Sequence, residues 1–206
     1  SEIQGVSYTL FILPGLIMMN TLTNATANTS SSMLQMKLLQ QLPDLLTAPL
    51  SGLEISLAYI IGGAVRGTVN GVLVLCLGVF LIDFQVQDII GTIGFIVLVS
   101  WAFSSMGLIL GQLAENWDQM AMMQNFFLTP LSFLGGIFYS IHMLPDWAQN
   151  LSFANPIYYM INGIRFTILG VSDSPVNASF WMALLLTVLF TTAAILLMQS
   201  GKKIKQ

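Results

Sequence analysis

Charged side chains are scarce in this sequence of 206 residues. Asp, Glu, Lys and Arg make up 7% of the chain and hydrophobic residues make up 55%, whereas an ordinary soluble domain is roughly 25% charged. The six Lys and Arg form no cluster before the C-terminus, which argues against the basic surface that nucleic-acid binding requires. The composition therefore predicts an integral membrane protein, in contact with the lipid bilayer and without a nucleic-acid partner.

Residues for catalysis and metal ligation are scarce too. The single cysteine, Cys76, lies in an apolar run and excludes a disulfide within one chain. The single histidine, His142, has no neighbouring Cys or paired Glu, and the sequence holds no H-E-x-x-H, G-x-S-x-G or G-x-x-x-x-G-K-[ST] motif. We therefore predict no enzyme activity, no bound metal or cofactor, and no ATP hydrolysis by this chain.

Acidic residues are missing from the middle of the apolar segments. An ion-coupled secondary transporter usually carries a carboxyl group at mid-membrane. Here every Asp and Glu falls at the end of a predicted span or in a loop. If the protein transports a solute, the energy must come from elsewhere.

Long apolar segments dominate what is present. About 20 apolar residues are needed for a helix to cross a hydrocarbon core near 30 Å thick, and five segments predict an all-α polytopic fold. Glycines at four-residue steps, Gly63, Gly67 and Gly71, and then the pair Gly107 and Gly111, predict close packing between helices. The predicted spans are residues 8–33, 53–82, 89–113, 120–141 and 180–198.

The fourth predicted span is interrupted by Pro130 and by the pair Gly135-Gly136. The following segment, 142–179, is too polar to span twice, and predicts short helices that dip into or lie on the outer interface. Interrupted backbone at membrane depth survives only where protein or water satisfies its free amides and carbonyls. We therefore interpret this stretch as a gate.

Polar residues follow the first apolar run without any charge before Lys37. A helix over 8–33 would place Asn20, Asn24, Ala27, Asn28 and Ser31 along one side. One interpretation is a wet face that lines a path or a dimer seam. The other is that these side chains, with the threonines around them, only bond to neighbouring helices.

The segment 37–49 (KLLQQLPDLLTAP) has a different pattern, in which leucines at helical spacing are interrupted by Pro43 and closed by Pro49. It is either a helix at the membrane surface or a docking element for another subunit. The lysines 202, 203 and 205 predict a cytosolic C-terminus. Counting back across the spans puts Lys37 in the cytosol and 142–179 outside. Three aromatic side chains of that outer segment suit the headgroup level: Trp147, Tyr158 and Tyr159.

A series of short motifs now points to a family. The order PLSFLGGIFYS, LP-x-W, NP-x-x-Y and R-x-x-x-LG, over 130–170, resembles the membrane subunit of type-2 ABC exporters. Upstream, FILPGLIMMN (11–20), LLTAPLS (45–51) and GLILGQLAENWDQ (107–119) add to the resemblance, which covers nearly the whole chain in one order.

The resemblance implies the permease half of an ATP-driven exporter in the bacterial plasma membrane. Two copies would pair, and ATP and Mg would bind to separate ATPase subunits. Family members carry six spans after an amphipathic cytosolic helix. The chain 1–206 is therefore expected to be a single transmembrane domain without that helix and the first span.

The resemblance also implies three groups of site residues. We predict a loop that couples to the ATPase, a translocation path and an outer gate segment. The coupling residues are Asp44, Leu45, Leu46, Pro49, Glu115 and Asp118. The path residues are Asn20, Asn24, Asn28, Phe127 and Phe133. The gate residues are Tyr139, Pro145, Trp147, Asn155, Pro156 and Arg165.

Two other functions stay open at the level of sequence. A non-transporting membrane scaffold would fail to co-purify with an ATPase, and an ATP-independent channel would conduct without one. Exporters of lipids, glycans, drugs and peptides share this architecture, so the pattern does not predict the substrate.

Overall fold

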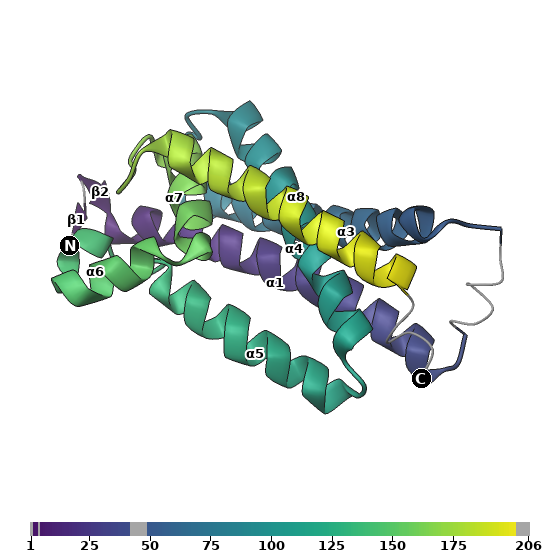
Figure 1. Ribbon diagram of the computed structural model, residues 1–206. Helices are drawn as coiled ribbons and strands as arrows, with labels where there is room; N and C mark the ends of the chain where they lie inside the picture. The colour runs from purple at the N-terminus through teal and green to yellow at the C-terminus, as the bar shows by residue number, and fades with distance from the viewer. Residues whose placement is uncertain (1, 4, 42–48, 201–206) are drawn as a thin grey trace.

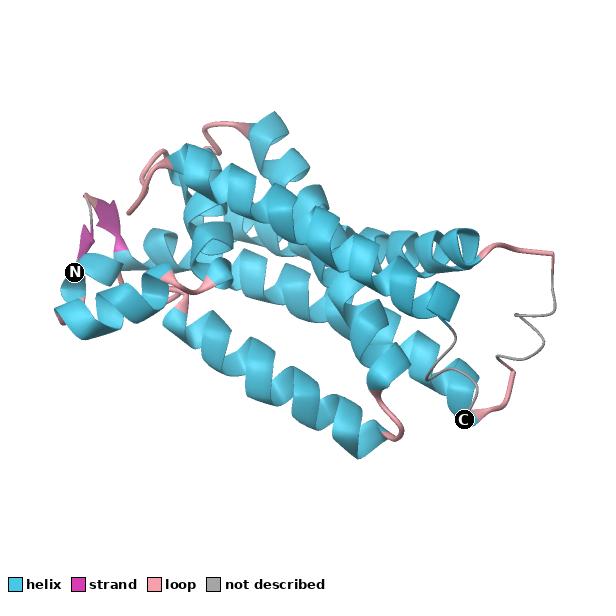
Figure 2. Cartoon of the chain, viewed as in Figure 1, coloured by secondary structure: helices cyan, strands magenta, loops and turns pink. Residues whose placement is uncertain are grey.

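The computed structural model describes residues 2–3, 5–41 and 49–200. Helices make up nearly all of the described chain, and one short antiparallel hairpin lies at its N-terminal end (Figure 1 and Figure 2). The elements are β1 (Glu2–Ile3), β2 (Val6–Ser7), α1 (Tyr8–Leu38), α3 (Gly52–Ile82), α4 (Ile89–Leu113), α5 (Trp117–Leu134), the 3-10 turn η1 (Ile141–Met143), α6 (Asp146–Phe153), α7 (Pro156–Leu169) and α8 (Val176–Ser200).

Four of the described helices are long and apolar enough to cross a membrane: α1, α3, α4 and α8. The all-α polytopic fold is thus confirmed. The count of five spans is not, because α5 has only 18 residues and a more polar sequence. The boundaries of α4 match the prediction at both ends, and Asp88 explains one of them. Its carboxylate caps the helix by accepting a hydrogen bond from the Gly91 N–H.

Helix α1 lies at the centre of the bundle and packs along both α3 and α4. Glycines make this close approach possible, as the sequence predicts. A Cβ atom on Gly67 would lie 2.7 Å from the Ala25 Cβ, and one on Gly111 would lie 2.7 Å from the Ser30 carbonyl oxygen. The main apolar cluster forms around this centre and includes residues from α1, α3, α4, α5, α7 and α8.

Helix α5 corrects one expectation about the interrupted span. The helix continues through Pro130 instead of breaking there, and it ends at Leu134. Gly135 follows as the C-cap and Gly136 takes a left-handed φ of 77°, so the glycine pair is what ends the helix. Figure 1 shows α5 diverging from the rest of the bundle along part of its length. Only Met120, Leu128 and Ser132 of this helix are buried.

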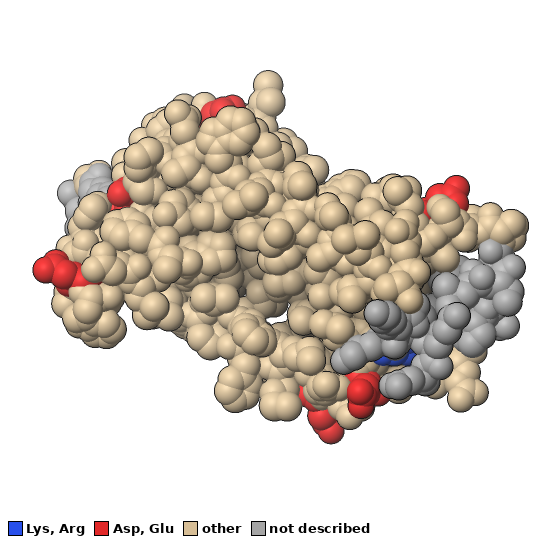
Figure 3. Space-filling view, in the orientation of Figure 1, with Lys and Arg blue, Asp and Glu red and all other residues tan. Residues whose placement is uncertain are grey.

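The two ends of the bundle differ. One end carries α6, α7 and the β hairpin and is called the α6–α7 end here. The other carries the C-terminal end of α1 and the loop between α4 and α5, and is called the Lys37 end. Figure 3 shows charged side chains near the ends of the visible face and uncharged surface across its middle. This distribution suits a protein whose middle lies in lipid.

Candidate functional site

The polar side of α1, which one interpretation of the sequence predicts to line a path or a dimer interface, is incompletely buried. Asn20, Asn24, Asn28 and Ser31 are half-buried and Ala27 is exposed. The Asn24 side-chain amide donates to the Asn20 backbone oxygen at 3.0 Å and to its side-chain oxygen at 3.1 Å. The Asn24 amide is therefore paired within α1 itself, on a face that another molecule can reach.

The threonines and serines of α1 lie mainly on its buried side. The Thr29 hydroxyl is 2.7 Å from that of Ser104 on α4, and the Thr26 hydroxyl reaches the Phe103 carbonyl at 3.2 Å. The two interpretations of this polar helix thus apply to different sides. Hydroxyls bond to α4, while asparagines occupy the open face.

The two predicted path residues of α5 have other neighbours. Phe127 lines a cavity of about 150 Å³ together with Phe103 on α4 and Phe190 on α8. The Phe133 ring stacks on Phe138 with 5.7 Å between ring centroids. A polar side chain of α5 that does contact α1 is Gln124, whose amide donates to the Ser30 hydroxyl at 2.5 Å. The assignment of a path to Phe127 and Phe133 stays a prediction.

At the Lys37 end, one side chain links the last turn of α1 to the end of α4. The Lys37 ammonium donates to the carbonyl oxygens of Gln112 and Ala114, at 2.9 and 2.8 Å. Both carbonyls are at the C-terminal end of α4, where the helix leaves such groups unpaired and where positive charge is favoured. No local sequence pattern predicts this contact, because it joins residues more than 70 positions apart.

The predicted coupling residues are only partly described by the structure. Pro49, Glu115 and Asp118 are exposed at this end. Asp118 lies in the first turn of α5, beside the Asn116 cap. The residues Asp44, Leu45 and Leu46 lie outside the described range, as do the lysines at 202, 203 and 205.

At the α6–α7 end, the segment after α5 satisfies the carbonyl groups at the end of that helix. The Leu131 oxygen accepts from the Asn155 amide at 2.6 Å, and the Phe133 oxygen accepts from the Tyr139 hydroxyl at 2.9 Å. The Leu134 oxygen accepts from the Ser152 hydroxyl at 3.2 Å. A helix that ends at membrane depth needs such partners, so the segment 135–155 keeps the end of α5 stable there.

Asn155 has a second role. Its side-chain oxygen accepts from the Ile157 N–H at 2.9 Å and so caps α7, whose first residue is Pro156. The same side chain therefore starts α7 and holds the end of α5. The two predicted gate residues Asn155 and Tyr139 are thus brought to one place by their bonds to α5.

Arg165 is the largest fully buried side chain in the described chain. Its Nη2 donates to the Gly136 carbonyl at 2.7 Å, its Nη1 lies 3.4 Å from the Asp173 carboxylate, and its guanidinium lies 3.9 Å above the Phe11 ring centroid. The Asp173 carboxylate also accepts from the Ser140 hydroxyl at 2.6 Å. The guanidinium thus joins α7, the turn after α5, the α7–α8 loop and the start of α1.

Burial lowers the pKa of Arg165 to about 10, and the negative charge of Asp173 partly opposes this shift. The guanidinium still carries its charge at neutral pH. Its partner Asp173 was not among the predicted site residues. A usable signal existed, because Arg165 is the only Lys or Arg in the segment 142–179 and Asp173 follows it closely in the sequence.

The other predicted gate residues lie at the surface. Pro145 precedes the first turn of α6 as its N-cap, and Trp147 is 72% exposed. One of the three aromatic residues expected to suit the headgroup level is not accessible to lipid headgroups. Tyr158 is 1% exposed and packs edge-on against Phe153 and Tyr159.

The chain is similar to known membrane transport proteins. The family model described as "ABC-2 type transporter" matches residues 1–169. The chain is 39% identical to the inner membrane transport permease YadH of Escherichia coli strain K12, over 99% of this chain and 80% of that protein. It is 25% identical to nodulation protein J of Sinorhizobium fredii, over 80% of this chain and 63% of that protein. It is also 24% identical to the probable multidrug ABC transporter permease YbhR of Escherichia coli, over 92% of this chain and 52% of that protein.

Proposed function

The chain belongs to the ABC-2 type transporter family, and from this membership we propose that it is the membrane permease subunit of an ATP-driven exporter. The exporter acts in a bacterial inner membrane and moves its substrate away from the cytosol. ATP and Mg bind to a separate ATPase subunit, and two copies of the permease form the transmembrane unit.

One observation carries the structural side of this proposal. A membrane-length helix, α1, presents half-buried asparagines on an open face while its other side packs against α3 and α4. Amide side chains that face lipid are costly. A polar substrate or a second copy of the permease is therefore the natural neighbour of this face, and both fit an exporter whose path runs between two subunits.

The Lys37 end supplies the proposed site of coupling. The exposed residues Pro49, Glu115 and Asp118 lie there, and Asp44, Leu45 and Leu46 come shortly before Pro49 in the sequence. Because Lys37 bonds to the end of α4, the last turn of α1 and the α4–α5 loop move together. A displacement of either loop by the ATPase is thereby transmitted to the central helix of the bundle.

Opening of the translocation path at the α6–α7 end would involve α5 and the segment after it. Helix α5 buries few of its residues, while its end is held by hydrogen bonds from Asn155, Tyr139 and Ser152. Elements with few buried apolar contacts move at low cost. In the proposed cycle, ATP closes the ATPase pair, the coupling loops shift, and α5 moves with the segment 135–155 to open the path outward.

The test uses the full-length permease co-expressed with an ABC ATPase subunit from the same organism. Replacing Leu45 and Leu46 together by Asp removes apolar contact of roughly 3 kcal/mol or more and adds unpaired charge. We expect the permease to insert normally, the ATPase to be lost from washed membranes, and ATP turnover to lose its dependence on the permease.

The matched control replaces Leu151 and Phe153 by Asp. These side chains are 51% and 38% exposed on α6, at the opposite end of the molecule, so association with the ATPase should persist. A permease that never retains an ATPase would indicate a scaffold. Flux through proteoliposomes without ATP would indicate a channel. Either result would overturn the proposal.

A further inference from the structure

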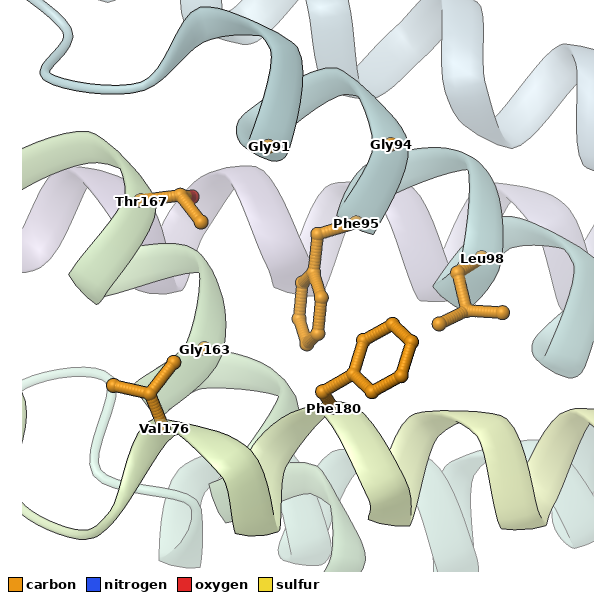
Figure 4. Close-up of a pocket in the computed structure, with 8 residues that line it drawn as sticks. All are labelled: Gly91, Gly94, Phe95, Leu98, Gly163, Thr167, Val176 and Phe180. Carbon is orange, nitrogen blue, oxygen red and sulfur yellow. The ribbon is translucent and has the colours of Figure 1, made fainter.

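A cavity of about 410 Å³ opens between α4, α7 and α8 near the α6–α7 end (Figure 4). Figure 4 shows Phe95 and Phe180 pointing into it from α4 and α8. Its volume lies within the range of small-molecule sites. It is separate from the polar face of α1 and from the coupling loops, and the proposed export function makes no use of it. The lining residues are Gly91, Gly94, Phe95, Leu98, Gly163, Thr167, Val176 and Phe180.

The lining of the cavity is apolar. Thr167 is the one residue of the lining with a polar side chain, and its hydroxyl donates to the Ile164 carbonyl at 3.0 Å. Glycines create the space. A Cβ atom at Gly94 would meet nothing within 4 Å, and the missing side chain of Gly163 leaves room for the Phe95 ring against α7. Such a cavity suits a hydrocarbon chain and has no free partner for a polar ligand.

The cavity lies at lipid depth. Its α4 residues lie within the first ten residues of a span and its α8 residues within the first five. At 1.5 Å per residue, this places the cavity within about 15 Å of the helix ends, in one leaflet of the bilayer. Its rim continues the lipid-facing surface, because Ile90 and Phe180 are 86% and 49% exposed.

The polar end of the rim is acidic. The exposed Asp88 caps α4 beside the cavity, with its carboxylate accepting from the N–H of the lining residue Gly91 at 2.8 Å. Backbone bonds hold this rim to α7, since the N–H groups of Gln87 and Asp88 donate to Ile168 and Thr167. The described basic side chains lie elsewhere: Lys37 at the opposite end, Arg66 on α3, and Arg165 buried beside Asp173.

We propose that this cavity binds one acyl chain of a phospholipid whose headgroup carries a primary ammonium, which lies beside Asp88. The apolar space accepts the chain, and the carboxylate at the rim attracts the ammonium. An anionic headgroup would meet repulsion at the same place. The occupant is thus a bilayer lipid, selected by charge and held by a cavity on the lipid-facing surface.

The test is native mass spectrometry of the purified full-length permease, incubated with phosphatidylethanolamine or phosphatidylglycerol of the same acyl chains. Gly94→Leu fills the cavity, and we expect it to lower phosphatidylethanolamine occupancy about tenfold, which corresponds to roughly 1.4 kcal/mol. The matched control is Gly62→Leu on α3, where an added Cβ also meets nothing within 4 Å. It should bind lipid as the unmodified protein does. Equal binding by both variants would refute the site.

Asp88→Asn tests the headgroup separately, because asparagine keeps the helix cap and removes the charge. We expect a preference for phosphatidylethanolamine over phosphatidylglycerol of about two- to fivefold in the unmodified protein, the size of an exposed ion pair, and no preference in the variant. Preference that is absent from the start, or that survives the substitution, would refute the assigned headgroup. If Gly94→Leu does not fold, the smaller Gly94→Ala and this comparison still decide the proposal.

A photo-cross-linking side chain at Phe180, in membranes of the producing cell, identifies the natural occupant. Cross-links to phospholipid are expected. Cross-links to a second copy or to another polypeptide would show that protein covers the cavity, and would overturn the proposal. These measurements require no ATPase, so their failure leaves the proposed export function standing, and failure of ATPase association leaves the lipid site standing.

Discussion

Arg165 and Asp173 form an ion pair inside the protein, with Nη1 and Oδ2 3.4 Å apart and with side chains that are 1% and 0% exposed. Desolvation of a buried pair often cancels the attraction between its charges, and here burial lowers the pKa of Arg165 to about 10 despite its partner. The pair therefore adds little net stability. Its effect is to fix the α7–α8 loop and the turn after α5 in one arrangement.

Removing one member of this pair leaves a buried charge without its partner. We expect Arg165→Met to lower the free energy of unfolding by about 3–5 kcal/mol, visible as a lower melting temperature in detergent. The double variant Arg165→Met, Asp173→Leu should recover most of that loss. A double variant as unstable as the single one would mean that the hydrogen bond from Arg165 to Gly136, and not the ion pair, dominates.

Asn155 gives a prediction about the end of α5. Asn155→Ala removes the cap of α7 and the donor to the Leu131 carbonyl, and we expect a loss of about 1–3 kcal/mol in unfolding free energy. Asn155→Asp keeps an N-cap oxygen but lacks the N–H donor, so it should recover only part of the loss. The control is Asn150→Ala on α6, which keeps the backbone bond from the Ala154 N–H to residue 150 and should be neutral. Equal stability of Asn155→Ala and Asn150→Ala would contradict this role.

Lys37 gives a prediction about coupling. Lys37→Met keeps the apolar stem and removes the donors to Gln112 and Ala114. A hydrogen bond made by a charged group contributes about 1.5–3 kcal/mol. We expect the ATPase to remain bound while its stimulation by the permease falls about tenfold, measured as ATP turnover in proteoliposomes. Lys37→Arg should retain most of the stimulation. Unchanged turnover in Lys37→Met would show that the link between α1 and α4 plays no part in transmission.

The orientation of the chain is directly measurable. In a Cys76→Ser background, single cysteines at Asp146 and Glu115 report on the α6–α7 end and the Lys37 end, and both native side chains are exposed. We expect an impermeant thiol reagent added outside to label Asp146→Cys and to leave Glu115→Cys unlabelled. The opposite pattern would place the Lys37 end outside and would overturn the assignment of the coupling loops to the cytosol.

The sequence alone was sufficient to predict the boundaries of helices that begin or end at strong local signals. Helix α4 begins at the predicted residue, directly after the Asp88 cap, and the four-residue glycine steps of α3 mark the side that packs on α1. Pro130 misled the prediction because it weakens a helix without necessarily ending it, and the break came at Gly135. The burial of Tyr158 depends on tertiary packing, which no local pattern contains.

The candidate site was predictable only in part for the same reason. The polar face of α1 follows from helical spacing, but spacing left two interpretations of it, and the structure shows the asparagines half-buried. The bond from Asn155 to Leu131 joins residues 24 positions apart, and that from Lys37 to Ala114 joins residues 77 apart. Nothing in the local sequence specifies such pairs. These hydrogen bonds depend on how the helices pack against one another, and they connect residues that are far apart in the sequence.

The hydroxyls of α1 have a consequence for biosynthesis. Thr21, Thr26 and Ser30 each donate to the carbonyl four residues earlier, at 2.8 Å, and this helix is the least apolar of the four spans, with a mean hydropathy of 1.3. It leaves the ribosome before α3 and α4, which later bury it, have been made. Because its hydroxyls are paired within the helix itself, the nascent α1 segment can move from the translocon into the lipid bilayer before its partner helices are made. Helices α3 and α4 then dock against a helix that is already in the membrane.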